Sequence, residues 1–469
     1  MNRSEADSEI GLRRGAVTFF GSLAQSVGLL GPSAGVGLVV AGVVGVAGPT
    51  AWLTWIVGMV AITFVGYAVL ILARRFLTTG GLFPLAGKAA GRFAGYLTAF
   101  GALLWLVVAA PAVVIQTGIY MTSFLALFGL PSSNWTVIIV SLITLFVTGW
   151  LAYRGIEIAT RVMLAIEGVT IGLIVILLIV TLIVHPGGII DPAEFHFSGV
   201  HLSTIISGVV LVTFAFGGFE SATILGQEAS NGRRNIPMAV LGSLLVSGIF
   251  FVISTYVMVL GFSGTHYDLA SSPNALGQLA IIDGMRWYSY LITGALVGAV
   301  VAVNIALYNA GSRLLFTLPR EGVAMNWLSR TSSRWQTPTS GILIFLVINL
   351  VVVLLVGILG TSPVNAFDNL GTLSGYGAAV MYIVAAVAAA IFLARKWSLI
   401  GAVACFIGAV VIGYGLYTGF VPFPSYPTSV LAWIFIVLAL LVIVGGFFIL
   451  GRHRSAFQGL SVSEFGQDE

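Results

Sequence analysis

The chain alternates between long stretches without charged residues and short segments that carry the charges. Three stretches, 15–73, 93–153 and 397–451, contain 59, 61 and 55 residues without Asp, Glu, Lys or Arg. Each can hold two helices that cross a membrane, because one crossing needs about 20 apolar residues. Six shorter stretches hold one helix each: 168–190, 195–219, 235–267, 287–312, 335–367 and 369–394. The pattern therefore predicts an all-α polytopic membrane protein with twelve transmembrane helices.

The basic residues orient these helices. When the N-terminus is placed inside, 19 of the 20 Lys and Arg residues fall on the cytoplasmic side, and only Arg286 falls outside. The bias predicts a multi-pass protein of the cell membrane with both termini in the cytoplasm. We expect a cytoplasmic tail at 1–15, a transport core of ten helices at 16–394, two further helices at 395–451 and a second tail at 452–469.

Composition narrows the function. Hydrophobic residues make up 58% of the 469 residues and charged residues only 8%, whereas soluble domains carry about 25% charged residues. This balance excludes a soluble enzyme and a nucleic-acid-binding protein, and it makes the lipid bilayer the principal surrounding. The single cysteine, Cys405, excludes an intrachain disulfide and a cysteine-based metal site. His185, His196 and His201 lack metal-ligand spacing, so no metal or cofactor is predicted.

The first predicted span contains a helix-breaking sequence, Gly31-Pro32-Ser33-Ala34-Gly35. Proline lacks an N–H group and opposes continuation of the preceding turn, but it suits the first position of a new helix. The N–H groups of Ser33, Ala34 and Gly35 would then lie without helical partners at a positive dipole end. Such a helix start is a binding site for an anion, for example a carboxylate.

The sixth predicted span contains a second break, Phe214-Ala215-Phe216-Gly217-Gly218. A helix that ends near Gly217 and Gly218 would direct the carbonyl groups of Phe214, Ala215 and Phe216 at the middle of the membrane, where they favour a cation such as an ammonium. Together the two breaks would suit a zwitterion. Tight helix crossings would also explain either glycine-rich stretch taken alone.

The two breaks occupy corresponding positions in spans 1–5 and 6–10, which have opposite orientations because five spans per repeat is an odd number. Inverted repeats with matching broken helices are typical of transporters that bind their substrate at the breaks.

The sequence resembles the amino acid–polyamine–organocation superfamily of permeases over nearly its whole length. The resemblance is carried, in order, by 31–35, 214–222, 228–237, Arg313 and 319–322. It implies a helical fold of the leucine-transporter type with a 5+5 inverted repeat, in which spans 1, 2, 6 and 7 form a bundle against a scaffold of spans 3, 4, 8 and 9. The chain departs from the family pattern at Pro32 and in span 5, which has no Lys and reads Arg161 to Gly168.

Ionisable residues inside a membrane are costly and are candidates for function. Glu220 follows the second break, where it could carry a coupled proton, hold the broken segment or serve as a purely structural carboxylate. Glu167 in span 5 is expected near the inner face, either extended to the surface or paired. Glu228 and Arg313 could form an ion pair at an inner gate, or Glu228 could be a solvated loop charge.

Two further pairs of polar or aromatic residues share helix faces. Asn304 and Tyr308 could meet the first break, or they could hydrogen-bond between helices. Trp105 and Gln116 are eleven residues apart and could wall the substrate cavity, although tryptophan in a bundle commonly serves packing.

These observations predict a secondary active transporter of a small amino acid or related amine, and not an enzyme. Span 8 offers no Ser or Thr at 300–308 for a sodium ion, so we expect proton coupling or exchange. The alternatives are a sodium-coupled permease, a permease for polyamines or cationic amino acids, and a non-transporting sensor or channel of the same fold.

Overall fold

The computed structural model describes residues 17–78, 80–154, 160–190, 192–195, 202–225, 229–319, 321–322, 324–332, 335, 337–396, 398–425, 428–452 and 462–463. Both predicted tails lie almost entirely outside these residues. The described elements are helices apart from a two-residue antiparallel pair, β1 (Leu77–Thr78) with β2 (Val462–Ser463), and an isolated bridge between Val17 and Ala229.

The first half of the chain contains α2 (Phe19–Leu30), α3 (Pro32–Ala34), η1 (Gly35–Val39), α4 (Val40–Ala47), η2 (Gly48–Thr50), α5 (Ala51–Arg75), α6 (Leu82–Ala90), α7 (Arg92–Ala126), α8 (Asn134–Tyr153), α9 (Thr160–Val184), η3 (Pro192–Phe195), α10 (Leu202–Ser207) and α11 (Val209–Ala215). The second half contains η4 (Ser221–Leu225), α12 (Gly232–Phe262), α13 (Ala275–Ile282), α14 (Arg286–Thr317), η5 (Asn326–Ser329), α15 (Thr339–Ile358), α16 (Pro363–Arg395), α17 (Leu399–Thr418) and α18 (Thr428–Arg452).

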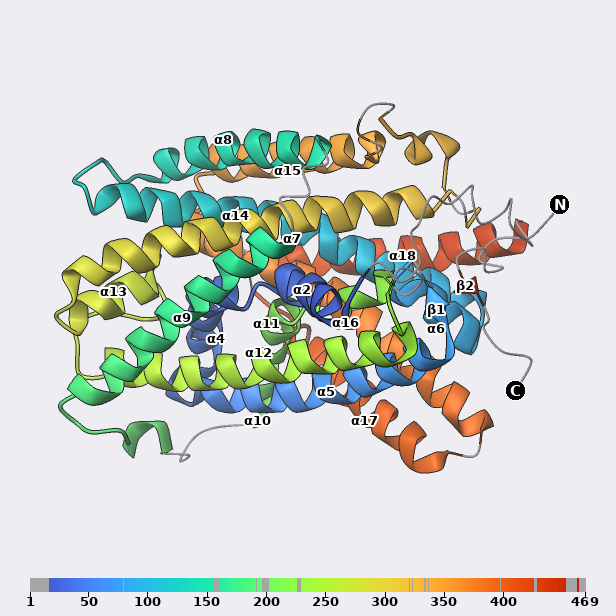
Figure 1. The fold of residues 1–469 in the computed structure, drawn as a ribbon, viewed down its shortest axis with the longest axis horizontal. Coiled ribbons are helices and arrows are strands. Elements are labelled where there is room, and N and C mark those ends of the chain that lie inside the picture. The colour runs from blue at the N-terminus through green and yellow to red at the C-terminus, as the bar shows by residue number, and fades with distance from the viewer. Residues whose placement is uncertain are drawn as a thin grey trace.

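Ten helical stretches of the described chain are long and apolar enough to cross a membrane. One of them, 19–75, has 57 residues and consists of two legs, because the chain turns back at Gly48, whose backbone φ of 67° is accessible to glycine. The apolar segment 202–215 is shorter than a full span. The helices run side by side along the long axis of the molecule (Figure 1). We call its two ends the β1 end and the α13 end, after the elements that lie there.

Helices α7 and α16 pack closely together in the interior. A side chain on Gly101 of α7 would lie 2.6 Å from the backbone nitrogen of Met381, and one on Gly377 of α16 would lie 2.6 Å from the backbone nitrogen of Trp105. The two backbones therefore touch through glycine, as in other helix pairs within membranes. This contact fixes the helix that carries Trp105 against the helix that carries Tyr382.

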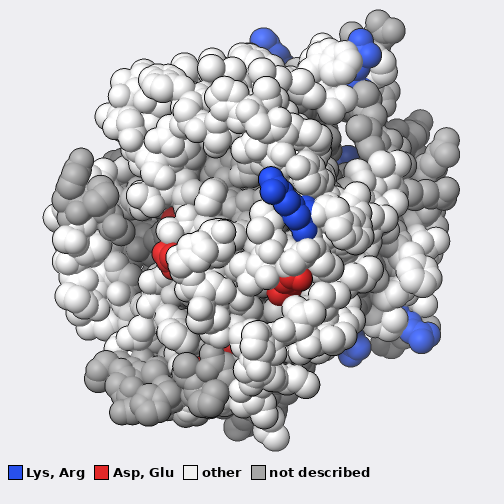
Figure 2. All heavy atoms as spheres, turned by 90° about the vertical axis from the view of Figure 1, so that its left-hand side faces the viewer, with Lys and Arg blue, Asp and Glu red and all other residues white. Residues whose placement is uncertain are grey.

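Helix α16 corrects one boundary predicted from the charges. We expected Asp368 to separate two spans, but α16 begins at Pro363 and contains Asp368 in its second turn. Figure 2 looks onto the α13 end and shows a surface made mostly of uncharged side chains, with acidic side chains and a basic side chain near its middle.

Candidate functional site

The first break lies where the sequence predicts it. Helix α2 ends at Leu30 because Gly31 adopts a left-handed conformation, with φ 59° and ψ 61°, and its N–H donates to the carbonyl of Val27 at 2.9 Å. Pro32 then occupies the first position of α3, where its missing N–H is not needed. The helix therefore restarts at the break in a new direction.

Two of the three N–H groups predicted to bind an anion already have partners. The N–H of Ser33 donates to Oε1 of Glu167 at 2.8 Å, and its hydroxyl donates to Oε2 at 2.7 Å. The N–H of Gly35 donates to the carbonyl of Gly31 at 3.0 Å. Within the described chain no acceptor meets the N–H of Ala34, which is therefore the donor that remains for a ligand.

Of the two alternatives for Glu167, extension to the inner surface or pairing, the contact with Ser33 excludes extension. Glu167 is only 5% exposed, and its carboxylate caps the start of α3 from α9. A helix start attracts a negative charge through its free N–H groups and its dipole. The carboxylate of Glu167 therefore occupies part of the site where we expected a substrate carboxylate.

The second break lies between α11 and η4. Helix α11 ends at Ala215, and Gly218 adopts a φ of 101°, which few residues other than glycine reach. The carbonyl of Phe214 accepts from the N–H of Gly217 at 3.0 Å, and the carbonyl of Phe216 accepts from the N–H of Phe219 at 3.3 Å. Among the three carbonyls predicted to bind a cation, that of Ala215 has no such bond in the described chain.

Hydrogen bonds join the two breaks on the side of the β1 end. The hydroxyl of Ser26 in α2 donates to the carbonyl of Phe219 at 2.7 Å and accepts from the N–H of Ala222 at 3.2 Å. The hydroxyl of Ser221 donates to the carbonyl of Gln25 at 3.0 Å. These bonds tie α2 to η4, the halves of the two broken helices that lie toward the β1 end.

A central cavity of about 40 Å³ lies between the two breaks. This volume holds about three waters. No charged residue lines it, and its polar side chains are Trp105 and Gln116. The lining residues are Leu29, Leu30, Gly31, Ala34, Gly35, Val39, Trp105, Ala109, Val113, Gln116, Phe214, Ala215, Gly217, Val303, Leu307 and Phe367. The two groups without partners, the N–H of Ala34 and the carbonyl of Ala215, both belong to residues that line this cavity.

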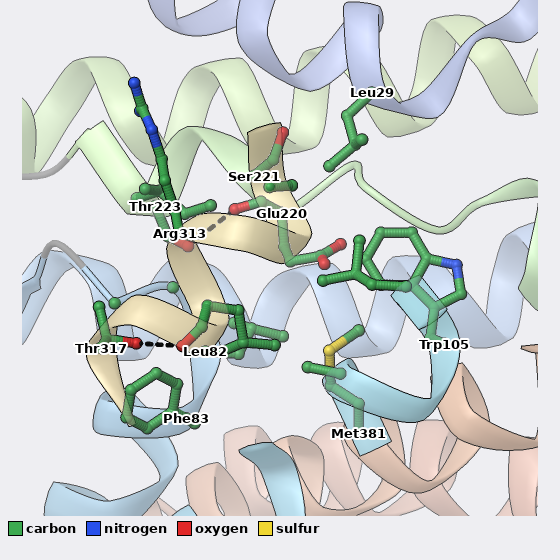
Figure 3. Close-up of a pocket in the computed structure, with 17 residues that line it drawn as sticks. Leu29, Leu82, Phe83, Trp105, Glu220, Ser221, Thr223, Arg313, Thr317 and Met381 are labelled. Atoms are coloured by element: carbon green, nitrogen blue, oxygen red, sulfur yellow. Dashed lines mark hydrogen bonds between the residues drawn. The ribbon is translucent and has the colours of Figure 1, made fainter. Parts of the chain in front are cut away.

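A second cavity, of about 60 Å³, adjoins the central cavity toward the β1 end. Leu29 and Trp105 line both cavities and therefore separate them. A side chain on Gly217 would overlap the indole of Trp105, so this glycine allows the ring to lie against the second break. Figure 3 shows this second cavity, with the carboxylate of Glu220 pointing toward Trp105.

Glu220 has a partner that the sequence did not suggest. The hydroxyl of Tyr382 in α16 donates to Oε2 of Glu220 at 2.8 Å and also lies 3.4 Å from the carbonyl of Phe216. Both side chains are buried. Arg313 lines the same cavity, but its side chain extends away from Glu220 (Figure 3). Glu228, the predicted partner of Arg313, lies outside the described residues.

Gln116 reaches the first break, whereas Asn304 contacts the neighbouring helix α7. The amide of Gln116 donates to the carbonyl of Ala34 at 2.8 Å and thus reaches the first break. Asn304 is buried in α14, where its amide nitrogen lies 3.5 Å from the hydroxyl of Thr117 in α7. Its neighbour Val303 contacts the break, because a side chain on Gly31 would overlap it.

The described residues contain no group of three His, Cys, Asp or Glu side chains that could hold a metal ion. His196 and His201 lie outside the described residues.

Similarity to known proteins identifies the family of the chain. The chain is 28% identical over 228 residues to the branched-chain amino acid permease BcaP of Lactococcus lactis, which covers 46% of each chain. It is 23% identical over 333 residues to the low-affinity putrescine importer PlaP of Escherichia coli, with 68% of this chain and 72% of the relative covered. It is 23% identical over 357 residues to BcaP of Bacillus subtilis, with 70% and 72% covered.

The chain thus spans less than half the length of the first relative and nearly three quarters of the other two. The profile of a family described as "Amino acid permease" matches residues 17–452, which is almost the whole chain. The protein therefore belongs to the amino acid permease family.

Proposed function

We propose that the protein is a secondary active transporter of a small neutral amino acid or related amine in the cell membrane, and that it works by alternating access. The observation that carries this proposal is the pair of broken helices that end at one cavity. The N–H of Ala34 and the carbonyl of Ala215 provide one donor and one acceptor across it. A substrate carboxylate would bind the donor, and a substrate ammonium would bind the acceptor.

The lining of the central cavity favours a neutral substrate. Relatives of the chain carry names that refer to branched-chain amino acids and to putrescine. Putrescine has two ammonium groups, and a carboxylate opposite the second one would be needed to offset its desolvation. The central cavity has no such carboxylate, whereas Val39, Val113 and Leu307 offer apolar surface for a hydrocarbon side chain.

The size of the central cavity bears on the mechanism. Room for about three waters is too little for an amino acid with a branched side chain, so the cavity must expand when substrate enters. In our proposal the tied unit of α2 and η4 rocks against α7 and α16. This motion would open the partition of Leu29 and Trp105 toward the β1 end.

Twelve spans and a 5+5 inverted repeat are part of the proposal. The stretch 19–75 supplies two spans, and α10, α11 and η4 together supply a discontinuous one. The two broken helices run in opposite directions, since α4 follows α2 toward the α13 end and η4 follows α11 toward the β1 end. With the basic residues inside, the β1 end and both termini would face the cytoplasm.

Coupling is proposed to run through carboxylates. Glu220 borders the cavity toward the β1 end, and its bond from Tyr382 would change when it gains a proton. Glu167 would release Ser33 when it gains one. Asn304 supplies a single side-chain oxygen in α14, whereas a sodium ion binds several oxygen atoms. We therefore favour proton coupling or exchange over sodium coupling, with Arg313 and Glu228 as residues of an inner gate.

Counterflow in proteoliposomes tests this function. Vesicles loaded with unlabelled leucine should accumulate labelled leucine transiently, because a carrier exchanges the two across the membrane. Vesicles without protein serve as the control. Saturable uptake with counterflow supports a transporter. Non-saturable flux would indicate a channel, and saturable binding without flux would indicate a sensor.

A further inference from the structure

Basic and aromatic side chains that line neither cavity gather where α8 ends and α15 begins. The two helices lie side by side along one edge of the bundle, with the C-terminal end of α8 toward the β1 end (Figure 1). A side chain on Gly149 of α8 would lie 2.5 Å from Leu346 of α15, so the helices are in contact there. We call this place the α8–α15 corner and define it by Trp150, Tyr153, Arg154, Trp327, Arg330 and Trp335.

Hydrogen bonds hold the connection before α15 against the end of α8. The hydroxyl of Thr337 donates to the carbonyl of Tyr153 at 2.8 Å. Two residues later, the hydroxyl of Thr339 donates to the carbonyl of Arg330 at 3.3 Å. The backbone of Arg330 therefore belongs to the same corner as the end of α8, although the two segments are far apart in the sequence.

The α8–α15 corner lies at the depth of the lipid headgroups. Helix α8 has 20 residues, none of them charged, and is therefore about 30 Å long, which is the thickness of the hydrocarbon core. Arg154 follows its last residue directly. Trp150, Trp327 and Trp335 are exposed, and tryptophan is enriched where the hydrocarbon core meets the headgroups. In a membrane, both arginines would therefore meet the headgroups of the leaflet at the β1 end.

The charge of the corner is positive and is not offset within the described chain. The stretches 134–154 and 324–358 contain no Asp or Glu. No described carboxylate pairs with Arg154 or Arg330. The side chains of Glu157, Arg161 and Arg334, which follow in the same connections, lie outside the described residues.

Arg154 is positioned by a ring rather than by an acid. Its guanidinium lies over the ring of Trp150, 4.1 Å from the centroid. A guanidinium held against a ring face keeps its N–H donors for an oxyanion, and it can bind two oxygens of a phosphate at once. Arg154 is thus pre-positioned for a phosphate group at the membrane surface.

From this arrangement we infer that the α8–α15 corner binds an anionic phospholipid, such as phosphatidylglycerol, in the leaflet at the β1 end. The two guanidinium groups would bind the phosphate, and the exposed tryptophans would lie against the glycerol and the upper acyl chains. Phosphatidylcholine has the same phosphate, but its choline cation would lie beside two arginines and weaken its binding. In the proposed orientation this leaflet is the cytoplasmic one, whose anionic lipids attract basic residues beside the membrane.

Native mass spectrometry of the full chain in neutral detergent micelles tests the lipid site, because it resolves each bound lipid. The parent protein should bind its first phosphatidylglycerol more tightly than its first phosphatidylcholine. Arg154→Gln and Arg330→Gln should each raise the Kd for phosphatidylglycerol about five-fold, and the double variant about twenty-five-fold. Trp150→Leu keeps an apolar side chain but removes the ring under the guanidinium, so it should raise this Kd about two-fold to five-fold.

Arg75→Gln is the matched control. Arg75 is exposed in the last turn of α5, so its replacement removes the same charge from the same end of the molecule. Its Kd for phosphatidylglycerol should stay within about two-fold of the parent value. All variants should unfold at the temperature of the parent protein in micelles without anionic lipid, which shows that they fold.

The outcomes decide the lipid site without a transport assay, so the proposed transport function stands or falls separately. Equal affinity of the parent protein for phosphatidylglycerol and phosphatidylcholine would refute the site, as would parent-like binding by the double variant. An equal loss for Arg75→Gln would also refute it, since the effect would then come from the overall charge of that end. Displacement of phosphatidylglycerol by an equal concentration of inorganic phosphate would show that the corner binds oxyanions and not a lipid.

Discussion

The contact between Glu167 and Ser33 should make a large contribution to stability for a single side chain. Glu167→Ala removes both hydrogen bonds and leaves a buried N–H and a buried hydroxyl without partners. Bonds to charged groups are worth about 1.5–3 kcal/mol each, and the Ser33 hydroxyl can turn to a backbone carbonyl, so we expect a loss of about 2–4 kcal/mol. Glu167→Gln preserves the shape and should lose only about 1–2 kcal/mol, which is the charge-assisted part.

Reversible unfolding in mixed micelles measures these losses. Ser33→Ala is the partner variant, because it removes the hydroxyl bond and retains the N–H bond. The double variant completes a cycle whose coupling energy should be about 1–2 kcal/mol. If the two single losses add within about 0.5 kcal/mol, the Ser33 hydroxyl does not bond to Glu167 in the folded protein, and that part of the contact is refuted.

Further predictions concern pH, coupling and topology. Burial raises the pKa of Asp283, outside the spans, above its ordinary value of 3.8, while the Thr181 hydroxyl and His185 lower it. The folded protein then holds a proton that the unfolded chain has lost, so the free energy of unfolding should fall as the pH rises from roughly 4 through the raised pKa. Thermal unfolding of Asp283→Asn should not show this fall, and a pH profile equal to that of the parent protein would contradict the prediction. An imposed proton gradient should drive leucine uptake better than a sodium gradient, and Glu220→Gln should abolish the proton dependence; uptake that requires sodium would overturn the coupling proposal. Single cysteines at Ser132 and Thr361, on a Cys405→Ser background, should react with an impermeant thiol reagent in intact cells, and a cysteine at Arg233 should not; the reverse pattern would invert the proposed orientation.

The sequence predicts the helix breaks because their causes are local. Pro32 cannot continue a helix, and Gly31 and Gly218 adopt backbone conformations that other residues avoid. Long uncharged stretches likewise predict crossing helices. Charge fails as a boundary marker at Asp368, because this carboxylate lies inside a helix where Gly42 of α4 makes room for it.

The partners of the buried polar groups could not be predicted in this way. The bond between Tyr382 and Glu220 joins residues 162 positions apart, and that between Ser26 and Phe219 joins residues 193 apart. Glu167 reaches Ser33 only because α9 packs beside the first break. Periodicity gives the face on which a residue lies, but the neighbour across that face depends on how distant helices pack.

A structure determined with saturating leucine tests most directly the claim that the two breaks form the substrate site. We predict leucine in an enlarged central cavity, with its carboxylate at the N–H of Ala34 and its ammonium at the carbonyl of Ala215. Glu167 should still cap Ser33. Leucine bound away from both breaks, with the central cavity still closed, would show that the breaks do not form the substrate site.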